Sequence, residues 1–130
     1  MATCHRVLVV EDEAPVRELL AYVLRDEGHE VVEARDGAEA LRILDSYPDP
    51  AAAICVILLD MMLPRVGGLQ VLQHLAERGR YIPVIAMSAS RRHLQQAEAH
   101  GAHATLSKPF ELDAVLAAVE RTCGHRHAGG

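Results

Sequence analysis

The chain has 130 residues, of which 50% are hydrophobic, 24% are charged and 3% are aromatic, and its formal net charge is −5. This length and this mixture predict one globular domain with a core of aliphatic side chains. Nucleic acids and anionic membranes attract clustered cations, and the sequence has no dense Lys/Arg stripe. It therefore argues against both as direct partners.

The cysteines and the apolar runs indicate a protein of the cytoplasm. Cys4, Cys55 and Cys123 are widely spaced and odd in number, which predicts free thiols in a reducing compartment. The longest uninterrupted apolar run covers residues 51–59 and is too short to cross a bilayer. The first six residues lack the apolar core of a signal peptide.

Apolar runs and segments of helical periodicity alternate along the chain. Predicted strands cover residues 7–10, 30–34, 55–59, 83–87 and 104–107. Helices are predicted over residues 15–28, 40–47, 69–79, 91–100 and 111–122. Strict alternation of this kind predicts an α/β protein with a parallel sheet and helices on both faces, as in the flavodoxin-like doubly wound fold.

The composition of single elements adds to this outline. Strand 30–34 has polar ends, which favours a place toward an edge of the sheet. Helix 91–100 has a thin apolar stripe, mainly Leu94 and Ala97, so we expect it to be the loosest helix. We expect the domain to cover residues 1–123 and to be followed by a flexible tail, residues 124–130.

The most informative stretch runs from Cys55 to Pro64. Residues 55–59 are apolar at every position, which is typical of a strand covered on both faces in the middle of a parallel sheet. Asp60 follows directly, and Pro64 prevents a regular continuation. Open α/β sheets bind ligands at the carboxyl ends of their strands, so Asp60 is either a site residue or simply the opening of a turn.

Polar side chains follow four of the five predicted strands. They are Glu11, Asp12, Asp60, Ser88 and Lys108. In a parallel sheet these strand ends meet at one edge, where three carboxylates and one ammonium would leave a formal charge of −2. One divalent cation would balance this charge, and oxygen ligands favour Mg²⁺ over zinc. Such a cleft has the groups required for phosphoryl transfer.

Five motifs occur in the order and spacing of a known family. They are Glu11-Asp12, Asp60-Met61-Met62-Leu63-Pro64, Ser88-Ala89, Gly101-Ala102 and Lys108-Pro109-Phe110. Together they make the chain resemble a receiver domain of two-component response regulators, from about Arg6 to Cys123. Each motif alone has an ordinary explanation; the acid pair, for example, could cap the helix that begins near Pro15.

The resemblance implies that Asp60 accepts a phosphoryl group from a phosphohistidine on a sensor kinase or a phosphotransfer protein. It implies a Mg²⁺ site made by Asp12, Asp60, the Met62 backbone carbonyl and Glu11. Lys108 would pair with phosphoryl oxygens, and the Ser88 hydroxyl would move to hydrogen-bond one of them. The family further implies the strand order 2-1-3-4-5 and a cis peptide bond before Pro109.

Three departures from the family pattern affect these expectations. Thr105 stands where the family usually has Tyr or Phe, so the usual inward turn of an aromatic side chain on phosphorylation is in doubt at this second switch position. Gly67-Gly68 replaces a common Asp-Gly pair, which suggests a looser loop after Pro64. The connection 47–53 is longer than is typical, but we expect it at the amino end of the sheet, away from the cleft.

The leading hypothesis is a regulatory phosphoacceptor rather than an enzyme. Because the chain ends near residue 130, we expect it to act through a protein effector or through a homodimer that forms on phosphorylation. A docking module that needs no phosphorylation is the alternative that Thr105 favours. An aspartyl phosphatase would need an acid at Met62, and a flavin-binding protein would need aromatic residues that the sequence lacks.

Overall fold

The computed structural model describes residues 6–46 and 54–129, and it describes side chains as far as Thr122. The predictions for Cys4, the Cys123 thiol and the connection 47–53 concern residues outside this description. The strands are β1 Arg6–Val10, β2 Glu30–Ala34, β3 Val56–Asp60, β4 Val84–Ser88 and β5 Ala104–Ser107. The helices are α1 Ala14–Asp26, α2 Gly37–Asp45, α3 Gly68–Glu77, α4 Arg91–Ala99 and α5 Leu112–Gly129.

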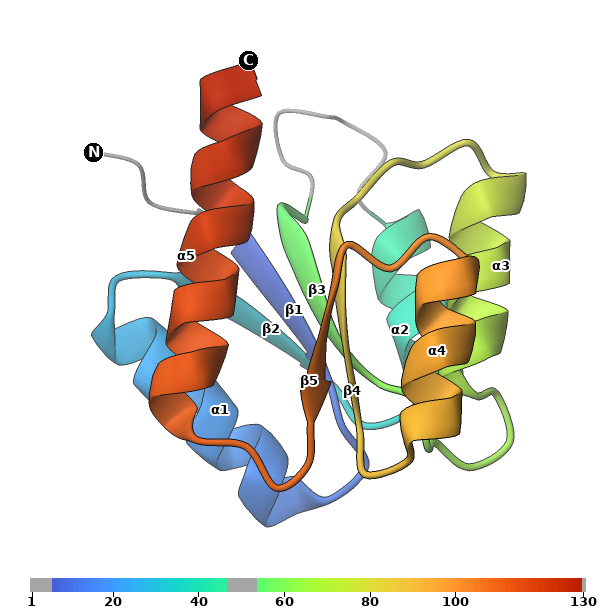
Figure 1. Ribbon diagram of the computed structural model, residues 1–130, viewed down its shortest axis with the longest axis horizontal. Coiled ribbons are helices and arrows are strands. Elements are labelled where there is room, and N and C mark those ends of the chain that lie inside the picture. The colour runs from blue at the N-terminus through green and yellow to red at the C-terminus, as the bar shows by residue number, and fades with distance from the viewer. Residues whose placement is uncertain (1–5, 47–53, 130) are drawn as a thin grey trace.

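The five strands form one parallel sheet in the order β2-β1-β3-β4-β5. Helices α1 and α5 cover one face of this sheet, and α2, α3 and α4 cover the other (Figure 1). The flavodoxin-like fold and the strand order implied by the family resemblance are therefore confirmed. Strand β2 lies at an edge, as its polar ends predicted.

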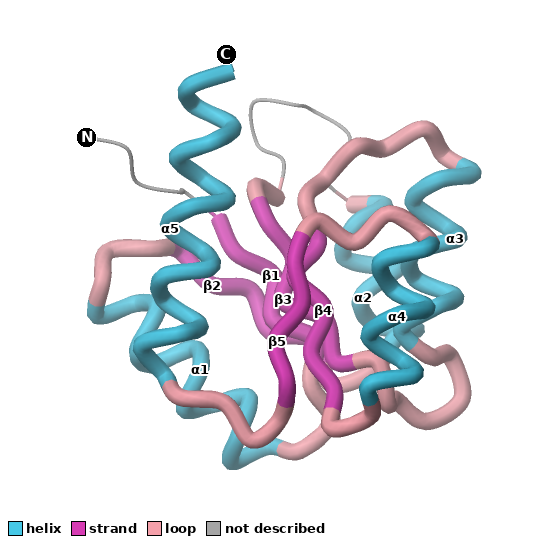
Figure 2. The backbone as a smooth tube through the Cα atoms, in the orientation of Figure 1, coloured by secondary structure: helices cyan, strands magenta, loops and turns pink. Residues whose placement is uncertain are grey.

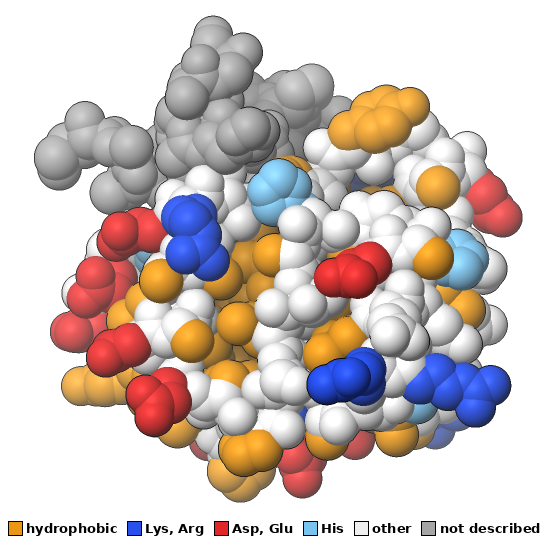
Figure 3. All heavy atoms as spheres, in the orientation of Figure 1, with side chains coloured by type: hydrophobic (Ala, Val, Ile, Leu, Met, Phe, Trp, Pro, Cys, Tyr) orange, Lys and Arg blue, Asp and Glu red, His pale blue; other side chains and the backbone are white. Residues whose placement is uncertain are grey.

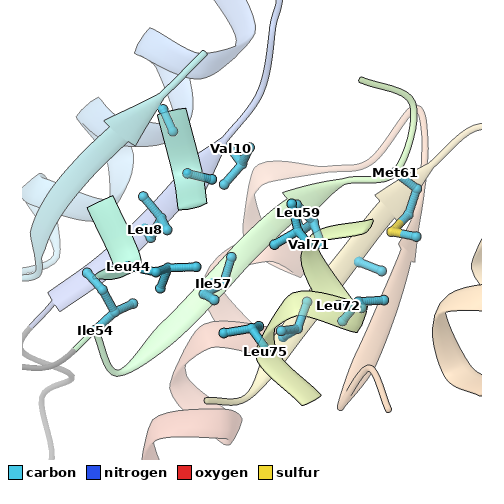
Figure 4. Packing of buried hydrophobic residues seen from close by; sticks show 14 of the residues in the cluster. Leu8, Val10, Leu44, Ile54, Ile57, Leu59, Met61, Val71, Leu72 and Leu75 are labelled. Carbon is cyan, nitrogen blue, oxygen red and sulfur yellow. The ribbon is translucent and has the colours of Figure 1, made fainter. Parts of the chain in front are cut away.

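The continuous apolar runs fill the core on both faces, because successive side chains of a strand point to opposite sides. Leu8 and Val10 pack toward α2, α3 and α4, whereas Val7 and Val9 pack toward α1 and α5. The central strand β3 divides in the same way and is buried at every position. Figure 4 shows the first of these clusters, in which Ile57 and Leu59 of β3 face Val71, Leu72 and Leu75 of α3.

Local signals explain where several helices begin and end. Pro15 lies in the first turn of α1, and Gly28 follows the helix with a φ of 94°, which glycine adopts without strain. The Asp36 side chain caps α2 by accepting a hydrogen bond of 2.8 Å from the Glu39 backbone N–H. The peptide bond between Lys108 and Pro109 is cis, as the resemblance implied.

Helices α4 and α5 can be compared with the expectations for the loosest helix and for the last helix. Helix α4 buries only Ala97 completely, in agreement with its thin apolar stripe. Helix α5 continues to Gly129, so it is longer than the predicted helix 111–122. The expectation of a flexible tail over residues 124–130 stays a prediction. A glycine within a helix costs about 1 kcal/mol and does not by itself end it. Within the described residues, no helix combines the length and the apolar character that a bilayer crossing requires.

Candidate functional site

Three carboxylates meet at the carboxyl edge of the sheet, where the loops gather below the strands in the view of Figure 2. Glu11 and Asp12 follow β1, and Asp60 is the last residue of β3. Each of the three offers an oxygen that lies within 4.8 Å of the others. Strands β1 and β3 are direct neighbours in the sheet, which brings together acids that are 48 positions apart in the sequence.

Lys108 reaches the same cluster from the loop between β5 and α5. Its Nζ atom lies 2.9 Å from Glu11 Oε1 and 3.2 Å from Asp60 Oδ2. Its backbone N–H donates to the Ser88 carbonyl oxygen at 2.9 Å, which fixes the loop against the end of β4. The ammonium therefore bridges two carboxylates that would otherwise repel each other.

Glu11 is completely buried, and its surroundings hold its side chain firmly. Besides Lys108, its carboxylate accepts a hydrogen bond of 3.3 Å from the Glu13 backbone N–H. Burial raises the pKa of Glu11 from 4.5 to about 7, and the nearby charge of Asp60 adds to the increase. The hydrogen bond from Lys108 opposes this increase but does not cancel it, because burial is the largest influence on the pKa of Glu11.

The pKa of Lys108 is raised, because its acidic neighbours outweigh the effect of burial. Burial, the largest influence, lowers it, because it disfavours the ammonium ion. The hydrogen bond to Glu11 and the charge of Asp60 raise it, and together with the weaker contributions they outweigh burial. The net result is a raised pKa, so Lys108 stays positively charged at the edge of the acidic cluster.

Asp60 is 3% exposed, and both of its carboxylate oxygens have partners. Oδ1 accepts from the Met62 backbone N–H at 3.0 Å, and Oδ2 faces Lys108. The Met61 N–H donates to the Met87 carbonyl at 2.9 Å and continues the ladder between β3 and β4 for one residue. The Met62 side chain is 55% exposed, so it does not belong to the core; Met61 packs there instead.

Ser88 and Thr105 lie on the neighbouring strands. Ser88 ends β4 and is buried, and its hydroxyl accepts a hydrogen bond of 3.0 Å from the Ser90 backbone N–H. Ser90 in turn caps α4 by accepting from the His93 N–H. Thr105 is half-buried in β5, in register with Ala86. Ser88 therefore borders the turn that leads into α4, whereas Thr105 lies beside the middle of β4.

The two glycines after Pro64 have different surroundings. The Gly67 N–H is bonded to Gln70 Oε1 at 2.8 Å. A Cβ atom at Gly68 would lie 2.7 Å from the Met61 sulfur and 2.8 Å from the Met61 Cα. Gly68 therefore allows the start of α3 to approach Met61 closely, whereas a Cβ at Gly67 would meet only the Leu63 carbonyl at 4.0 Å. The expectation that the pair loosens the loop stays a prediction.

Sequence reasoning missed one residue that contacts the acidic turn. Arg17 of α1 donates from Nη1 to the Glu11 backbone carbonyl at 2.8 Å. It also forms an ion pair with Glu33 of β2, with 3.4 Å between Nε and Oε1. Nothing in the linear spacing of these residues indicates the contact, because it depends on how α1 packs on the edge strand.

An apolar groove of about 530 Å³ lies beside Lys108. Its walls come from the start of α1 and from the loop that leads into α5. Glu13 and Lys108 are its charged members, and its apolar lining includes Pro15, Val16, Leu19, Phe110 and Leu112. A partner that approaches Asp60 from this side would therefore find apolar contact area next to the charged cluster.

A family model described as the response regulator receiver domain matches residues 7–120 of this sequence. The chain belongs to this family. The receiver domain is 40% identical over 124 residues to the phosphate regulon transcriptional regulatory protein PhoB of Escherichia coli strain K12. That alignment covers 89% of this chain and 52% of PhoB. Receiver domains are regulatory partners of histidine kinases, so the recognition made from the five motifs is confirmed.

Solved structures give the same result. The receiver domain of the Francisella response regulator 1452 matches with a TM-score of 0.83 and 27% identity, over 94% of this chain and 98% of that one. The response regulator protein TrrA from Thermotoga maritima, in complex with Mg²⁺-BeF, matches with a TM-score of 0.78 and 28% identity. The second comparison covers 91% of this receiver domain and 98% of TrrA.

The receiver domain spans about half the length of the curated relatives it matches, between 43% and 57% of each. These relatives are named as transcriptional regulatory proteins. These names describe whole proteins, whereas the expectation of no direct nucleic-acid partner concerned this domain alone and stays a prediction. The expectation that the chain carries no output domain stays a prediction.

Proposed function

We propose that Asp60 accepts a phosphoryl group from a phosphohistidine of a kinase or phosphotransfer protein in a Mg²⁺-dependent reaction. The observation that carries this proposal is the position of the Lys108 ammonium, which bridges Glu11 and Asp60 beside a third carboxylate. Membership of the receiver family and the Mg²⁺-BeF complex of TrrA support the same reading.

The acidic cluster fits a magnesium ion. Mg²⁺ binds oxygen ligands at about 2.0–2.1 Å, so two of its ligands lie at most about 4 Å apart. The oxygens of Glu11, Asp12 and Asp60 lie within 4.8 Å of one another, and the exposed Asp12 side chain has room to close the remaining gap. We assign the site to Asp12, Asp60 and the Met62 carbonyl, with Glu11 as a direct or water-mediated ligand. When bound, the ion would neutralise negative charge on the phosphoryl oxygens.

The transfer itself moves one phosphoryl group between two residues. A carboxylate oxygen of Asp60 attacks the phosphorus of the phosphohistidine, and an O–P bond forms while the P–N bond breaks. The electron pair of the P–N bond stays on the imidazole nitrogen, which takes a proton from solvent, and Asp60 becomes an acyl phosphate. Oxidation states do not change. The role of this chain is to hold the acceptor oxygen and the charges around it, which makes it a regulatory acceptor and not a turnover enzyme.

Lys108 supplies the positive charge on the protein side. Before transfer its ammonium is bonded to Glu11 and Asp60, at 2.9 and 3.2 Å. Once Asp60 carries a phosphoryl group, the same Nζ atom is within reach of the new oxygens and can keep its bond to Glu11. The Ser88 hydroxyl would exchange its bond with the Ser90 N–H for one with a phosphoryl oxygen.

The change of hydrogen-bond partner at Ser88 indicates which surface of the domain would respond to phosphorylation. Ser90 caps α4, so a change at Ser88 would alter the start of a helix that buries only Ala97 completely. Helix α4, the edge strand β5 and helix α5 lie side by side toward the viewer in Figure 1. Figure 3 shows this face with apolar side chains visible between α5 and β5 and basic side chains over α4. We propose that a protein effector or a second copy of the chain recognises this face.

Thr105 sets how the signal is transmitted. A half-buried threonine in β5 sweeps too little volume to act as an aromatic switch. The proposed route therefore runs through the backbone after Ser88 and the start of α4.

The phosphoryl donor would approach from the other side of the cleft, where the apolar groove beside Lys108 offers contact area. We take residues 1–123 as the domain that performs this function.

The test compares Asp60→Asn with the wild type and with Asp26→Asn, a control at the exposed end of α1. Each protein is incubated with Mg²⁺ and acetyl phosphate or phosphoramidate, and the mass of the intact chain is measured. We expect one added phosphoryl group on the wild type and on Asp26→Asn, none on Asp60→Asn, and none without Mg²⁺. An unlabelled wild type would overturn the proposal.

A second measurement separates signalling from mere labelling. NMR amide shifts are compared with and without beryllofluoride. We expect shifts at α4 and β5 in the wild type and none in Asp60→Asn. Labelling of Asp60 without any change at α4 and β5 would favour the docking module that needs no phosphorylation.

A further inference from the structure

Arg17 lies where it can control the geometry of the acidic turn, residues 11–13. Its side chain is 15% exposed, which is low for an arginine so close to the surface of a helix. From Nη1 it donates to the backbone carbonyl of Glu11 at 2.8 Å. This carbonyl belongs to the peptide unit that leads directly into Asp12, the acid that the proposed function assigns to the cation.

Among the described residues, no backbone N–H of β2 donates to the Glu11 carbonyl. The Glu11 N–H still donates to Ala34 at 3.0 Å, but Ala34 is the last residue of β2, and the chain then enters α2. Arg17 therefore takes the place that the next residue of the strand would occupy. An unsatisfied carbonyl at this depth would cost about 1–3 kcal/mol, so the turn has reason to keep this contact.

Other anchors of the turn are few. Asp12 has an exposed side chain, and Glu13 begins α1 without a side-chain cap. Among the described residues, the side-chain hydrogen bonds to this turn come from the Glu11 carboxylate, Lys108 and Arg17. Of these, Arg17 alone fixes the direction of a backbone carbonyl, and it thereby fixes the peptide plane before Asp12.

Arg17 is itself oriented by a second ion pair. Glu33 Oε1 lies 3.4 Å from Arg17 Nε, and Glu33 Oε2 lies 3.4 Å from Arg25 Nη1. Arg25 also donates to the Val31 carbonyl at 3.1 Å. One carboxylate of the edge strand thus holds two arginines of α1, of which only Arg17 reaches the Glu11 carbonyl.

We propose that Arg17 is a positioning residue for the cation site, which holds the Glu11–Asp12 peptide so that Asp12 faces Asp60. The inference rests on the proposed function, since it assumes that Mg²⁺ binds at this cluster. Partners that orient metal ligands from outside the coordination sphere commonly change metal affinity about 10–100-fold when they are removed.

The charge of Arg17 and its positioning role predict opposite changes in Mg²⁺ affinity when the side chain is removed. Arg17 carries a positive charge close to a site for a divalent cation, so its charge alone opposes binding. If Arg17 acted only through its charge, its removal would strengthen Mg²⁺ binding. If it positions the turn, its removal weakens binding despite the more negative surroundings. Arg25 carries the same charge nearby and does not contact the turn, which makes it the matched control.

The experiment measures Mg²⁺ affinity by NMR titration of backbone amides, without a phosphodonor, for the wild type, Arg17→Ala, Arg17→Lys and Arg25→Ala. We expect about tenfold weaker binding for Arg17→Ala. Arg17→Lys should lie between it and the wild type, because lysine keeps the charge but lacks the planar fork with which Arg17 reaches the Glu11 carbonyl from Nη1 and Glu33 from Nε. Arg25→Ala should bind as tightly as the wild type or slightly more tightly.

Urea unfolding of the same proteins identifies variants that have lost their fold. If Arg17→Ala does not fold, the conservative Arg17→Lys carries the test. Equal or tighter Mg²⁺ binding by a folded Arg17 variant would overturn this inference and leave the proposed function intact. Equal weakening in Arg25→Ala would also overturn it, since the effect would then come from the ion-pair network in general. A wild type that does not bind Mg²⁺ would overturn both proposals.

Discussion

The buried Glu11 carboxyl should make the stability of the metal-free domain depend on pH. Its pKa is about 7 in the folded domain and 4.5 in the reference state. Because the folded state holds the proton more tightly, the free energy of unfolding contributed by Glu11 is largest below about pH 4.5. It decreases as the pH rises through the interval from 4.5 to 7 and is constant above it. The difference in pKa corresponds to about 3 kcal/mol.

Urea unfolding of the wild type and of Glu11→Gln at several pH values isolates this contribution. Glutamine resembles the protonated acid in size and cannot ionise, so the other titrating groups cancel in the difference between the two proteins. We expect the two stabilities to be similar near pH 4.5 and the wild type to be less stable by about 3 kcal/mol above pH 7. Glu18→Gln, at an exposed position of α1, is the control for the removal of a surface carboxylate.

The reasoning also predicts how metal changes the result. Bound Mg²⁺ would favour the ionised carboxyl, so saturating Mg²⁺ should move the decrease toward lower pH and reduce it. Parallel curves for the wild type and Glu11→Gln between pH 5 and 7, without metal, would show that burial does not govern this group and would refute the reasoning.

Two further substitutions probe the packing and the charge of the site. Gly68→Ala places a methyl group 2.7 Å from the Met61 sulfur. We therefore expect the free energy of unfolding, measured with urea, to decrease by about 1–3 kcal/mol. Unchanged stability would contradict the close approach of Gly68 to Met61. Lys108→Met removes the cation that opposes the protonation of Glu11. A carbon-13 NMR titration of this variant should therefore find the pKa of Glu11 above about 7. A lower pKa would contradict the bridge that Lys108 forms between Glu11 and Asp60.

The sheet and the convergence of the acids could be predicted from the sequence because buried parallel strands are continuous apolar runs. The run that ends at Val10 and the run that ends at Leu59 each lead directly into acidic residues. Knowledge that the strands are parallel was then enough to bring Glu11 and Asp60 to one edge. Whether these residues perform the proposed roles stays a prediction.

The side-chain network around the acids could not be predicted. The bond from Arg17 to the Glu11 carbonyl requires the rotation of α1 on β2, which no local spacing encodes. The sharing of Lys108 between two carboxylates depends on the path of the loop into α5. The predicted helix 111–122 is shorter than α5, which continues to Gly129, because the prediction followed apolar periodicity and Val119 is the last residue of that pattern.

The division of the sheet into two rims has a practical consequence for protein engineering. Lys108 and the acids all lie at the rim where strands end, whereas the turns around Gly28 and Gly79 precede strands at the opposite rim. Tyr81, in the second of these connections, is 92% exposed. Peptide tags or whole inserted domains placed there would add mass far from the acceptor carboxylate. The domain therefore offers a natural attachment point for reporters that leave its chemistry undisturbed.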